Sequence, residues 1–426
     1  MLSDNRLQAV RLAVAFAGAA LLALPPPAHG QAVAADTLTL TEAIGMARQA
    51  NPMLSAARAT ADAAAQRVRP AGTLPDPELQ LGLMNRMISE FGSTADPMTM
   101  NQVLLMQMLP WPGKLGSARR AAEHTAGAAR ADAEDQALML QAQVRMAYYE
   151  VADADRALEV MRRTQRLLRD FLQVSTTMYA VGTAVQQDVL RAQVEVARMG
   201  EEITRMEQER VAMAARLNAL LGREATVPVP AVELPEPTQE LPPTDSLIAR
   251  ALTQRPALQA GTERVAAARA TLAGARRELY PDLQVGIAYQ IRPAYENMIS
   301  LMVGINLPIF AGRRQLPMRR QMAAMRDMSE AELLNLRNET IARIVETRAR
   351  AVRDRDLAQL YRSSILPQAR GAVQAALSSY RVGQVSFMQL VDNQMTVNQY
   401  EIETIRLLAD YQQAVGELTA LTGGQP

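Results

Sequence analysis

The chain has 426 residues, only 4% of them aromatic, and a formal net charge of +1 at pH 7. From Ala35 onward basic and acidic residues balance, so the basic surface that nucleic-acid binding requires is missing. The absence of Cys excludes disulfides, thiolate chemistry and a lipid anchored on an N-terminal cysteine. Plentiful Ala, with Gly and Pro gathered at a few points, favours long packed helices over mixed cores.

Residues 1–34 have the pattern of a secretory signal peptide. Arg6 and Arg11 precede an apolar run at 12–24, and Ala32-Val33-Ala34 offers the small residues of a cleavage site. Cleavage after Gly30 is the alternative. The run is shorter than the roughly 20 residues that a membrane-spanning helix needs, and no later run reaches that length. We therefore expect export with cleavage.

The rest of the chain contains an internal repeat. We divide it into a first repeat at 35–224, a Pro-rich connector at 225–243 and a second repeat at 244–426. The sequence Tyr-Ala-Val-Gly-Thr at 179–183 returns as Tyr-Arg-Val-Gly-Gln at 380–384, 201 positions later. Each copy sets a Gly, which tolerates positive φ, between two long helical patterns. Each repeat therefore contains a helical hairpin.

In chain order, each repeat begins with a short helix, a proline and an Ala-rich helix, with Thr41 and Asp245 as predicted N-caps. Prolines then end the helical pattern, at 75 and 77 and again at 281. Next come segments of period two at 78–83 and 98–109 in the first repeat, and at 283–291 and 299–307 in the second. Alternation over about ten residues is typical of an outer-membrane strand, although a hairpin in a soluble protein would fit each pair equally well.

The helical period resumes after Gly113 and Gly312. It runs without proline to about residue 180 in the first copy, and is interrupted only by Pro317 and Pro367 in the second. Returning helices are expected at 184–222 and 385–422. Helices of roughly 65 residues are stable only when they pack on one another as coiled coils.

Four predicted strands per chain cannot close a barrel, and an open sheet edge in lipid leaves backbone groups unpaired. The strands must therefore be pooled between chains, and a trimer gives twelve. The doubled Tyr-x-Val-Gly turns, strand pairs and proline stops resemble the TolC family of outer-membrane efflux ducts over the whole mature sequence. The resemblance implies a mainly α fold with a membrane β-barrel, built as a homotrimer with a twelve-stranded barrel in outer-membrane lipid and an α-helical barrel in the periplasm.

The resemblance also implies function, partners and sites. A family member is the outer-membrane channel of a tripartite efflux pump, and works with a periplasmic adaptor of the membrane-fusion type and an inner-membrane transporter, here expected to be of the resistance-nodulation-division type. The turn residues meet the adaptor, and carboxylates six and nine positions past the second tip glycine constrict the entrance. Asp188 is the matching position in the first repeat, whereas one of the two second-repeat positions holds an amide. The docking residues are Val181, Gly182, Thr183, Val382, Gly383 and Gln384, and the gate residues are Gln389, Asp392 and Asp188.

Methionine is unusually frequent, with 24 residues. Those on helices are expected to fill cores, but matching the strands to a barrel turns a set of strand methionines toward the lumen. Thioethers are soft ligands that suit Cu(I) or Ag(I), so the sequence suggests a duct for soft heavy-metal ions; drugs are the other substrate class. The set comprises Met84, Met98, Met100, Met106, Met108, Met298 and Met302.

Enzyme signals are poor. The histidines are His29, in the leader, and His124, which is expected to be a surface or packing residue, and Gly113-Lys114 lacks the remainder of a phosphate-binding loop. We expect neither catalysis nor a cofactor. Two alternatives remain open: a duct for type I protein secretion, and a periplasmic coiled-coil scaffold without a pore.

Overall fold

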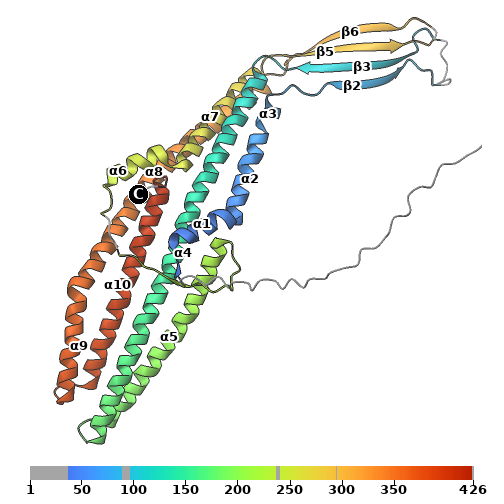
Figure 1. Cartoon of the computed structure of the whole chain (residues 1–426). Coiled ribbons are helices and arrows are strands. Elements are labelled where there is room, and N and C mark those ends of the chain that lie inside the picture. Colours follow the sequence, from blue (N-terminus) through green and yellow to red (C-terminus); the bar gives the residue numbers. More distant parts are fainter. Residues whose placement is uncertain (1–36, 89–95, 237–239, 294, 425–426) are drawn as a thin grey trace, which may run out of the picture. The chain divides into compact units, whose positions relative to one another are not determined.

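The computed structural model describes residues 37–88, 96–236, 240–293 and 295–424. The predicted signal peptide and most of the loop at 85–97 lie outside the described residues. Within them, helices and strands follow the predicted order in both repeats (Figure 1).

The first repeat begins with α1 (Leu40–Ala50), α2 (Pro52–Gln66) and the short α3 (Val68–Ala71). The second begins with α6 (Thr244–Gln254) and α7 (Pro256–Arg277). In both, a proline stands at the first position of the second helix, where its missing N–H costs no hydrogen bond.

Both predicted N-caps are wrong. The cap of α1 is Thr39, because Glu42 lies three residues after it and reaches back to the Thr39 backbone, completing a capping box. Thr41 could not form this box, since the residue three positions later is apolar. The residue before α6 is Pro243, and Asp245 lies in the first turn, where its negative charge still favours the helix dipole.

One antiparallel sheet combines the strands of both repeats in the order β2-β3-β5-β6. Its strands are β2 (Glu78–Met84), β3 (Met100–Leu109), β5 (Asp282–Ile291) and β6 (Met298–Asn306). The pairing of β3 with β5 joins the two repeats. The period-two pattern therefore predicted the strands correctly, although β3 begins two residues later than expected.

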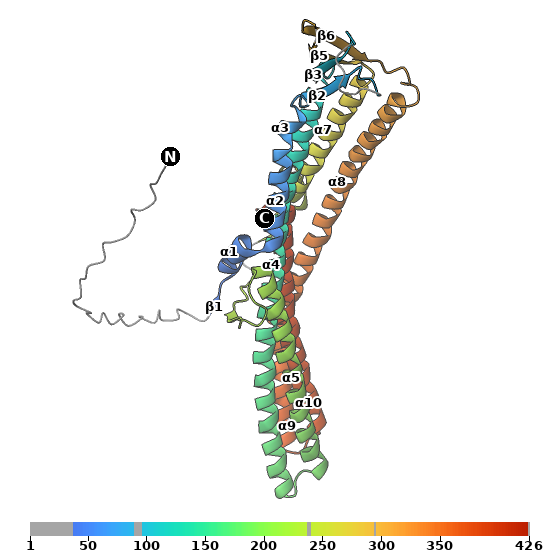
Figure 2. The ribbon, with the colours of Figure 1, turned by 90° about the vertical axis from the view of Figure 1, so that its right-hand side faces the viewer.

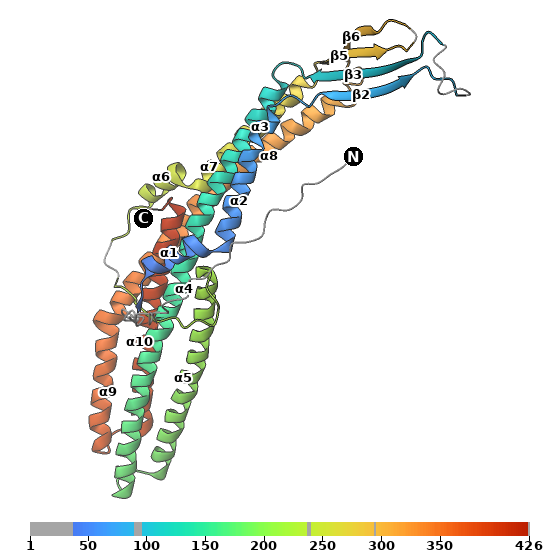
Figure 3. The same cartoon turned by 45° about the vertical axis from the view of Figure 1, so that its right-hand side comes forward.

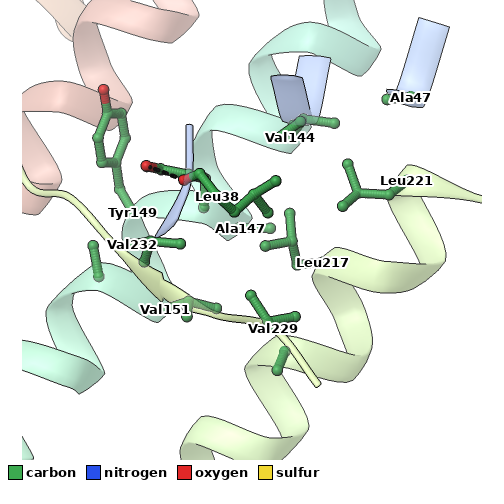
Figure 4. Packing of buried hydrophobic residues seen from close by; sticks show 14 of the residues in the cluster. Leu38, Ala47, Val144, Ala147, Tyr149, Val151, Leu217, Leu221, Val229 and Val232 are labelled. Atoms are coloured by element: carbon green, nitrogen blue, oxygen red, sulfur yellow. Dashed lines mark hydrogen bonds between the residues drawn. The ribbon is translucent and has the colours of Figure 1, made fainter. Parts of the chain in front are cut away.

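A second, two-stranded parallel sheet pairs β1 (Thr37–Leu38) with β4 (Ala231–Val232). β4 lies in the connector, for which the sequence indicated neither helix nor strand. Its Val232 is buried in the core cluster of Figure 4, beside Leu38, Val151 and Leu217. Tyr148 adds to this cluster by donating a hydrogen bond to the Leu38 carbonyl (2.8 Å).

In the first repeat the long helix is continuous. α4 (Lys114–Ala180) has 67 residues and α5 (Gln186–Leu221) has 36. In the second repeat α8 (Gln315–Leu360) passes through a π-helical turn, η1 (Tyr361–Ile365), into α9 (Leu366–Arg381), and α10 (Phe387–Leu421) returns.

The break in the second repeat results from Pro367. The ring of a proline inside a helix clashes with the carbonyl four residues earlier, so the turn before it must widen. The N–H of Leu366 accordingly bonds to the carbonyl of Tyr361, five residues back. Pro317 causes no break, because it is the third residue of α8.

The two hairpins, α4–α5 and α9–α10, lie side by side (Figures 2 and 3) and share one apolar core. Four of its residues, from three of the four helices, are at most 1% exposed: Leu168, Met199, Phe387 and Leu390. Among the described residues, no helix offers a stretch long and apolar enough to span a membrane.

Candidate functional site: the paired hairpin tips and the sheet faces

The two tips have the same backbone geometry. Gly182 and Gly383 both have φ of 75°, and each donates its N–H to the carbonyl of the duplicated tyrosine at 3.0 Å. Val181 and Val382 are both 68% exposed, and the other four predicted docking residues are exposed as well. The tips therefore present backbone and small side chains rather than an enclosed pocket.

The duplicated tyrosines have different surroundings. Tyr179 is 47% exposed, whereas Tyr380 is 3% exposed and packs edge-on against Phe387. The Tyr380 hydroxyl donates a hydrogen bond to Oδ2 of Asp188 in the first repeat (3.3 Å). Burial, and then the negative charge of Asp188, raise the pKa of Tyr380 to about 12, so the hydroxyl keeps its proton and remains a donor.

Among the described residues, no hydrogen bond or ion pair joins the three predicted gate residues to one another. Asp188 is held by Tyr380, while Gln389 and Asp392 are exposed on α10. The Gln389 N–H bonds to the side chain of Ser386, the N-cap of α10, which fixes the start of that helix. Across the described residues, the Asp392 carboxylate has no ion pair within 4 Å.

The sequence shows Tyr380 only as part of the duplicated motif and gives no sign that Met388 contributes to the tips. Met388 accepts a hydrogen bond at its sulfur from Arg191 (3.0 Å), a second side-chain link between the two hairpins near their tips. The duplicated Tyr was visible in the sequence, but nothing local distinguishes its buried copy from its exposed one.

The sheet has one apolar face. Antiparallel register places residues opposite one another on the same face, and one row runs Leu81, Val103, Tyr289, Ile299 across all four strands. Leu81 is 76% exposed and Leu301, on the same face, is 78% exposed. Five further apolar side chains on this face are also exposed: Leu79, Leu83, Ile287, Val303 and Ile305.

The opposite face carries six of the seven predicted methionines: Met84, Met100, Met106, Met108, Met298 and Met302. Met84 lies directly opposite Met100. Met106 and Met302 flank Gly286 on the strand between them, and the Met106 side chain reaches over that glycine. Met98 lies before β3 and is 60% exposed.

No group of three or more His, Cys, Asp or Glu side chains in the described part of the chain is arranged to hold a metal ion. His124 bonds through Nδ1 to Glu263 (2.8 Å), which fits the expected packing role.

A family model described as outer membrane efflux protein matches residues 43–223 and 247–424. The chain belongs to this family. Its members are outer-membrane efflux proteins of the TolC type, so the chain is located in the outer membrane and extends into the periplasm. The two matched segments correspond to the two repeats.

Solved structures agree on the fold. A membrane protein from Pseudomonas aeruginosa aligns with a TM-score of 0.80 and 20% identity, covering 91% of this chain and 90% of that one. The outer-membrane channel OprN aligns at 0.79 and 18% identity, covering 90% of each chain. The outer membrane protein VceC from Vibrio cholerae aligns at 0.77 and 19% identity, covering 91% and 96%. No curated protein matches the chain.

Proposed function

We propose that three copies of this efflux protein close a twelve-stranded barrel in the outer membrane and form the exit duct of a tripartite efflux pump. The observation that carries the proposal is the open sheet of one chain. Its edge strands, β2 and β6, each have one pairing side free within the chain, and its Leu81 face is strongly exposed. Pairing β6 of one copy with β2 of the next satisfies both edges, and lipid covers the apolar face.

The helical hairpins then form the periplasmic part of the duct. The tips, with Val181 and Val382 equally exposed, are the surface offered to a periplasmic adaptor, which links the duct to an inner-membrane transporter of the resistance-nodulation-division type. The doubled tip geometry supports this, because three chains would present six similar turns in a ring.

Cysteine cross-linking tests the trimer. The chain has no Cys, so introduced pairs report without background. With Leu81→Cys on β2 and cysteines placed singly along β6, from Ile299 to Ile305, we expect one position to give a covalent trimer under oxidising conditions. The matched control is Leu81→Cys with Val103→Cys, which face each other within one chain and should give only monomer. Covalent dimers as the largest product from every β6 position would contradict the trimer.

The link between Tyr380 and Asp188 is proposed to hold the entrance. It joins the second hairpin of a chain to the first beside the bond from Arg191 to Met388, so breaking it weakens the hold between the two tips. Asp392, exposed and without an ion pair among the described residues, is the candidate for contact with passing cations, and Gln389 one turn earlier would supply an amide where the family has a carboxylate.

A second candidate concerns the substrate. The face opposite the lipid-facing leucines is the lumen face of the proposed barrel, and the row of Met106, Gly286 and Met302 places two thioethers on it, on either side of a residue that has no side chain. This favours transient passage of soft ions such as Cu(I) or Ag(I) over a purely drug-exporting duct.

The type I secretion duct is the alternative within the family. It would share the barrel and the tips, so the two functions differ in cargo. Deletion of the protein should sensitise cells to metal ions or drugs if it serves an efflux pump, and should remove a protein from the medium if it serves secretion.

A further inference from the structure

Four arginines gather where the second repeat leaves the sheet. Arg313 and Arg314 lie in the turn before α8, and Arg319 and Arg320 lie in its second turn. All four are exposed, and within the described residues none has an ion pair or a side-chain hydrogen bond. No acidic residue occurs between Glu296 and Asp327, so the positive charge is not balanced along the chain. We call these four residues the arginine patch.

The patch continues directly from exposed apolar side chains. Leu307, Ile309 and Phe310 are 64%, 76% and 69% exposed. They follow β6, whose apolar face is the one that the proposed function assigns to lipid. On the first repeat, Trp111 stacks on Tyr280 at the same end of the sheet, with ring centroids 5.3 Å apart. Aromatic rings followed by arginines are typical of the boundary between a membrane and water.

The nearby carboxylates are paired with Lys114 and not with the arginine patch. A groove of about 500 Å³ between the end of the sheet and the start of α8 is lined by Arg314, Glu278 and Asp282, with Lys114 between the acids. Lys114, 9% exposed, lies 3.3 Å from Glu278 and 2.9 Å from Asp282, and the Trp111 N–H also bonds to Asp282. Lys114 offsets one of these two negative charges, and among the described residues neither carboxylate forms an ion pair with Arg314, so the four arginines keep a net positive charge.

The corresponding part of the first repeat carries less unpaired positive charge. Gly113 is followed by Lys114, which is buried in its ion pairs, whereas Gly312 is followed by the exposed Arg313 and Arg314. Further along, Arg119 is paired with Glu123 at 2.8 Å. Arg120 is then the one exposed arginine of this segment without an ion pair among the described residues, whereas the second repeat has four, so the dense patch belongs to the second repeat.

We propose that the arginine patch binds the phosphate-bearing headgroups of anionic phospholipids in the leaflet nearest the helices. The proposal rests on the proposed membrane barrel, because only then does the apolar segment 307–310 lie in acyl chains and the patch at headgroup level. A guanidinium can hold a phosphate through two parallel hydrogen bonds, and its long stem can cross apolar surface to reach it. The occupant is a lipid and not a free anion, since the apolar segment beside the patch must be covered at the same time.

The single tryptophan provides the measurement. Trp111 is the only Trp in the chain, is 40% exposed, and stacks on Tyr280, which lines the same groove as Arg314. The full-length protein in detergent micelles is titrated with brominated phosphatidylglycerol or with brominated phosphatidylcholine of the same acyl chains, and quenching of Trp111 fluorescence is followed. We expect phosphatidylglycerol to reach half-maximal quenching at a lower mole fraction than phosphatidylcholine. The ratio of the two mole fractions should be roughly fivefold for each arginine that binds a headgroup.

Two variants that lose the same number of positive charges distinguish an effect of the arginine patch from an effect of the protein's net charge. Replacing the four patch arginines with Gln should leave quenching by phosphatidylcholine intact and remove the preference for phosphatidylglycerol. The control replaces four exposed arginines that also lack ion pairs among the described residues, and it should keep the preference: Arg58, Arg166, Arg205 and Arg337.

The possible failures point to different conclusions. Quenching of the natural protein by both lipids at equal mole fraction overturns the headgroup proposal while leaving the barrel intact. No quenching by either lipid contradicts the membrane position of the sheet end, and with it the proposed function. Loss of the trimer in the patch variant, at unchanged lipid preference, would assign the arginines to a contact between subunits and would also overturn the proposal.

Discussion

The hydroxyl of Tyr380 and the carboxylate of Asp188 bridge the two helical hairpins of the chain at 3.3 Å. Tyr380→Phe removes this bond but keeps the ring packed on Phe387. We expect a loss of about 1 kcal/mol in the free energy that holds the hairpins together, and a more open entrance. Single-channel conductance in planar bilayers should rise.

The duplicated tyrosine supplies the control for this experiment. Tyr179→Phe alters the same motif at a site that is 47% exposed and has no side-chain hydrogen bond among those found in the described residues. Its conductance should equal that of the natural protein. If the two variants conduct equally, the link between Tyr380 and Asp188 does not hold the entrance.

Asp392 should set how the entrance responds to cations. Three exposed carboxylates near a threefold axis repel one another and attract divalent ions, so Asp392→Asn should weaken block by divalent cations. Gln389→Ala, one turn earlier on the same helix, changes no charge and serves as the control. Identical block curves for the aspartate variant and the natural protein would remove Asp392 from the gate.

The glycines that end the long helices should differ in tolerance. Gly182 and Gly222 have φ of 75° and 71°, so alanine at either one incurs similar backbone strain, on the order of 1 kcal/mol. A Cβ at Gly182 meets nothing within 4 Å, whereas one at Gly222 would lie 2.7 Å from the Ala50 carbonyl oxygen. Gly222→Ala should therefore lower the thermal unfolding midpoint clearly more than Gly182→Ala does, and equal shifts would contradict this contact.

Asp153 should make stability depend on pH. Burial, and then the charge of Asp410, raise its pKa from 3.8 to about 6, with Glu403 adding to the effect and Arg406 opposing it. The folded protein therefore holds a proton that the unfolded chain releases at lower pH, so the contribution is fully present below about pH 4 and is lost as pH rises through about 6. Asp153→Asn should raise the free energy of unfolding at neutral pH by on the order of 2 kcal/mol and flatten this slope.

Replacing Asp155, two residues after Asp153, should have the opposite effect on stability. Asp155 receives hydrogen bonds from Arg210, including one of 3.2 Å to its Oδ2. Asp155→Asn should therefore destabilise the protein at neutral pH. Thermal unfolding followed by helical circular dichroism at two pH values distinguishes the two variants, and stabilisation by both would show that the ion pair with Arg210 contributes nothing.

The methionine row predicts a selective phenotype. Met106→Leu with Met302→Leu keeps the apolar volume but removes both thioethers, so copper and silver tolerance should fall while drug tolerance stays unchanged. Met325→Leu with Met328→Leu, exposed on α8, is the control. Unchanged metal tolerance in the first variant, with normal export, would exclude the metal proposal.

The local signals in the sequence were sufficient for much of this fold. Alternation along residues 283–291 defined a strand because every second side chain of β5, on one face of the sheet, is apolar or aromatic, and the tip glycines indicated reversals because only Gly tolerates their φ cheaply. Both features depend on residues close together in the chain. The four strands and the duplicated turns could therefore be predicted without tertiary information.

The surroundings of the two tyrosines could not be predicted in this way. Tyr179 and Tyr380 sit in the same motif, and only the packing of the second hairpin on the first buries one of them against Phe387 and Asp188. The N-cap of α1 was predicted wrongly for a more local reason. Thr39 is identified as the cap by Glu42, three residues later, and the start of the apolar pattern does not mark it. The barrel, the trimer and the gate depend on contacts between chains, which remain proposals.

The π-helical turn at Tyr361–Ile365 gives the duplicated hairpins unequal stiffness. In the first hairpin, α4 is a continuous α-helix. In the second, the helix that leads to the tip contains a widened π-helical turn followed by a proline. Bending concentrates where a helix has fewer and longer-range backbone bonds. If the tips separate, the second hairpin should pivot at this joint while the first stays straight, so the gene duplication has produced one fixed arm and one hinged arm.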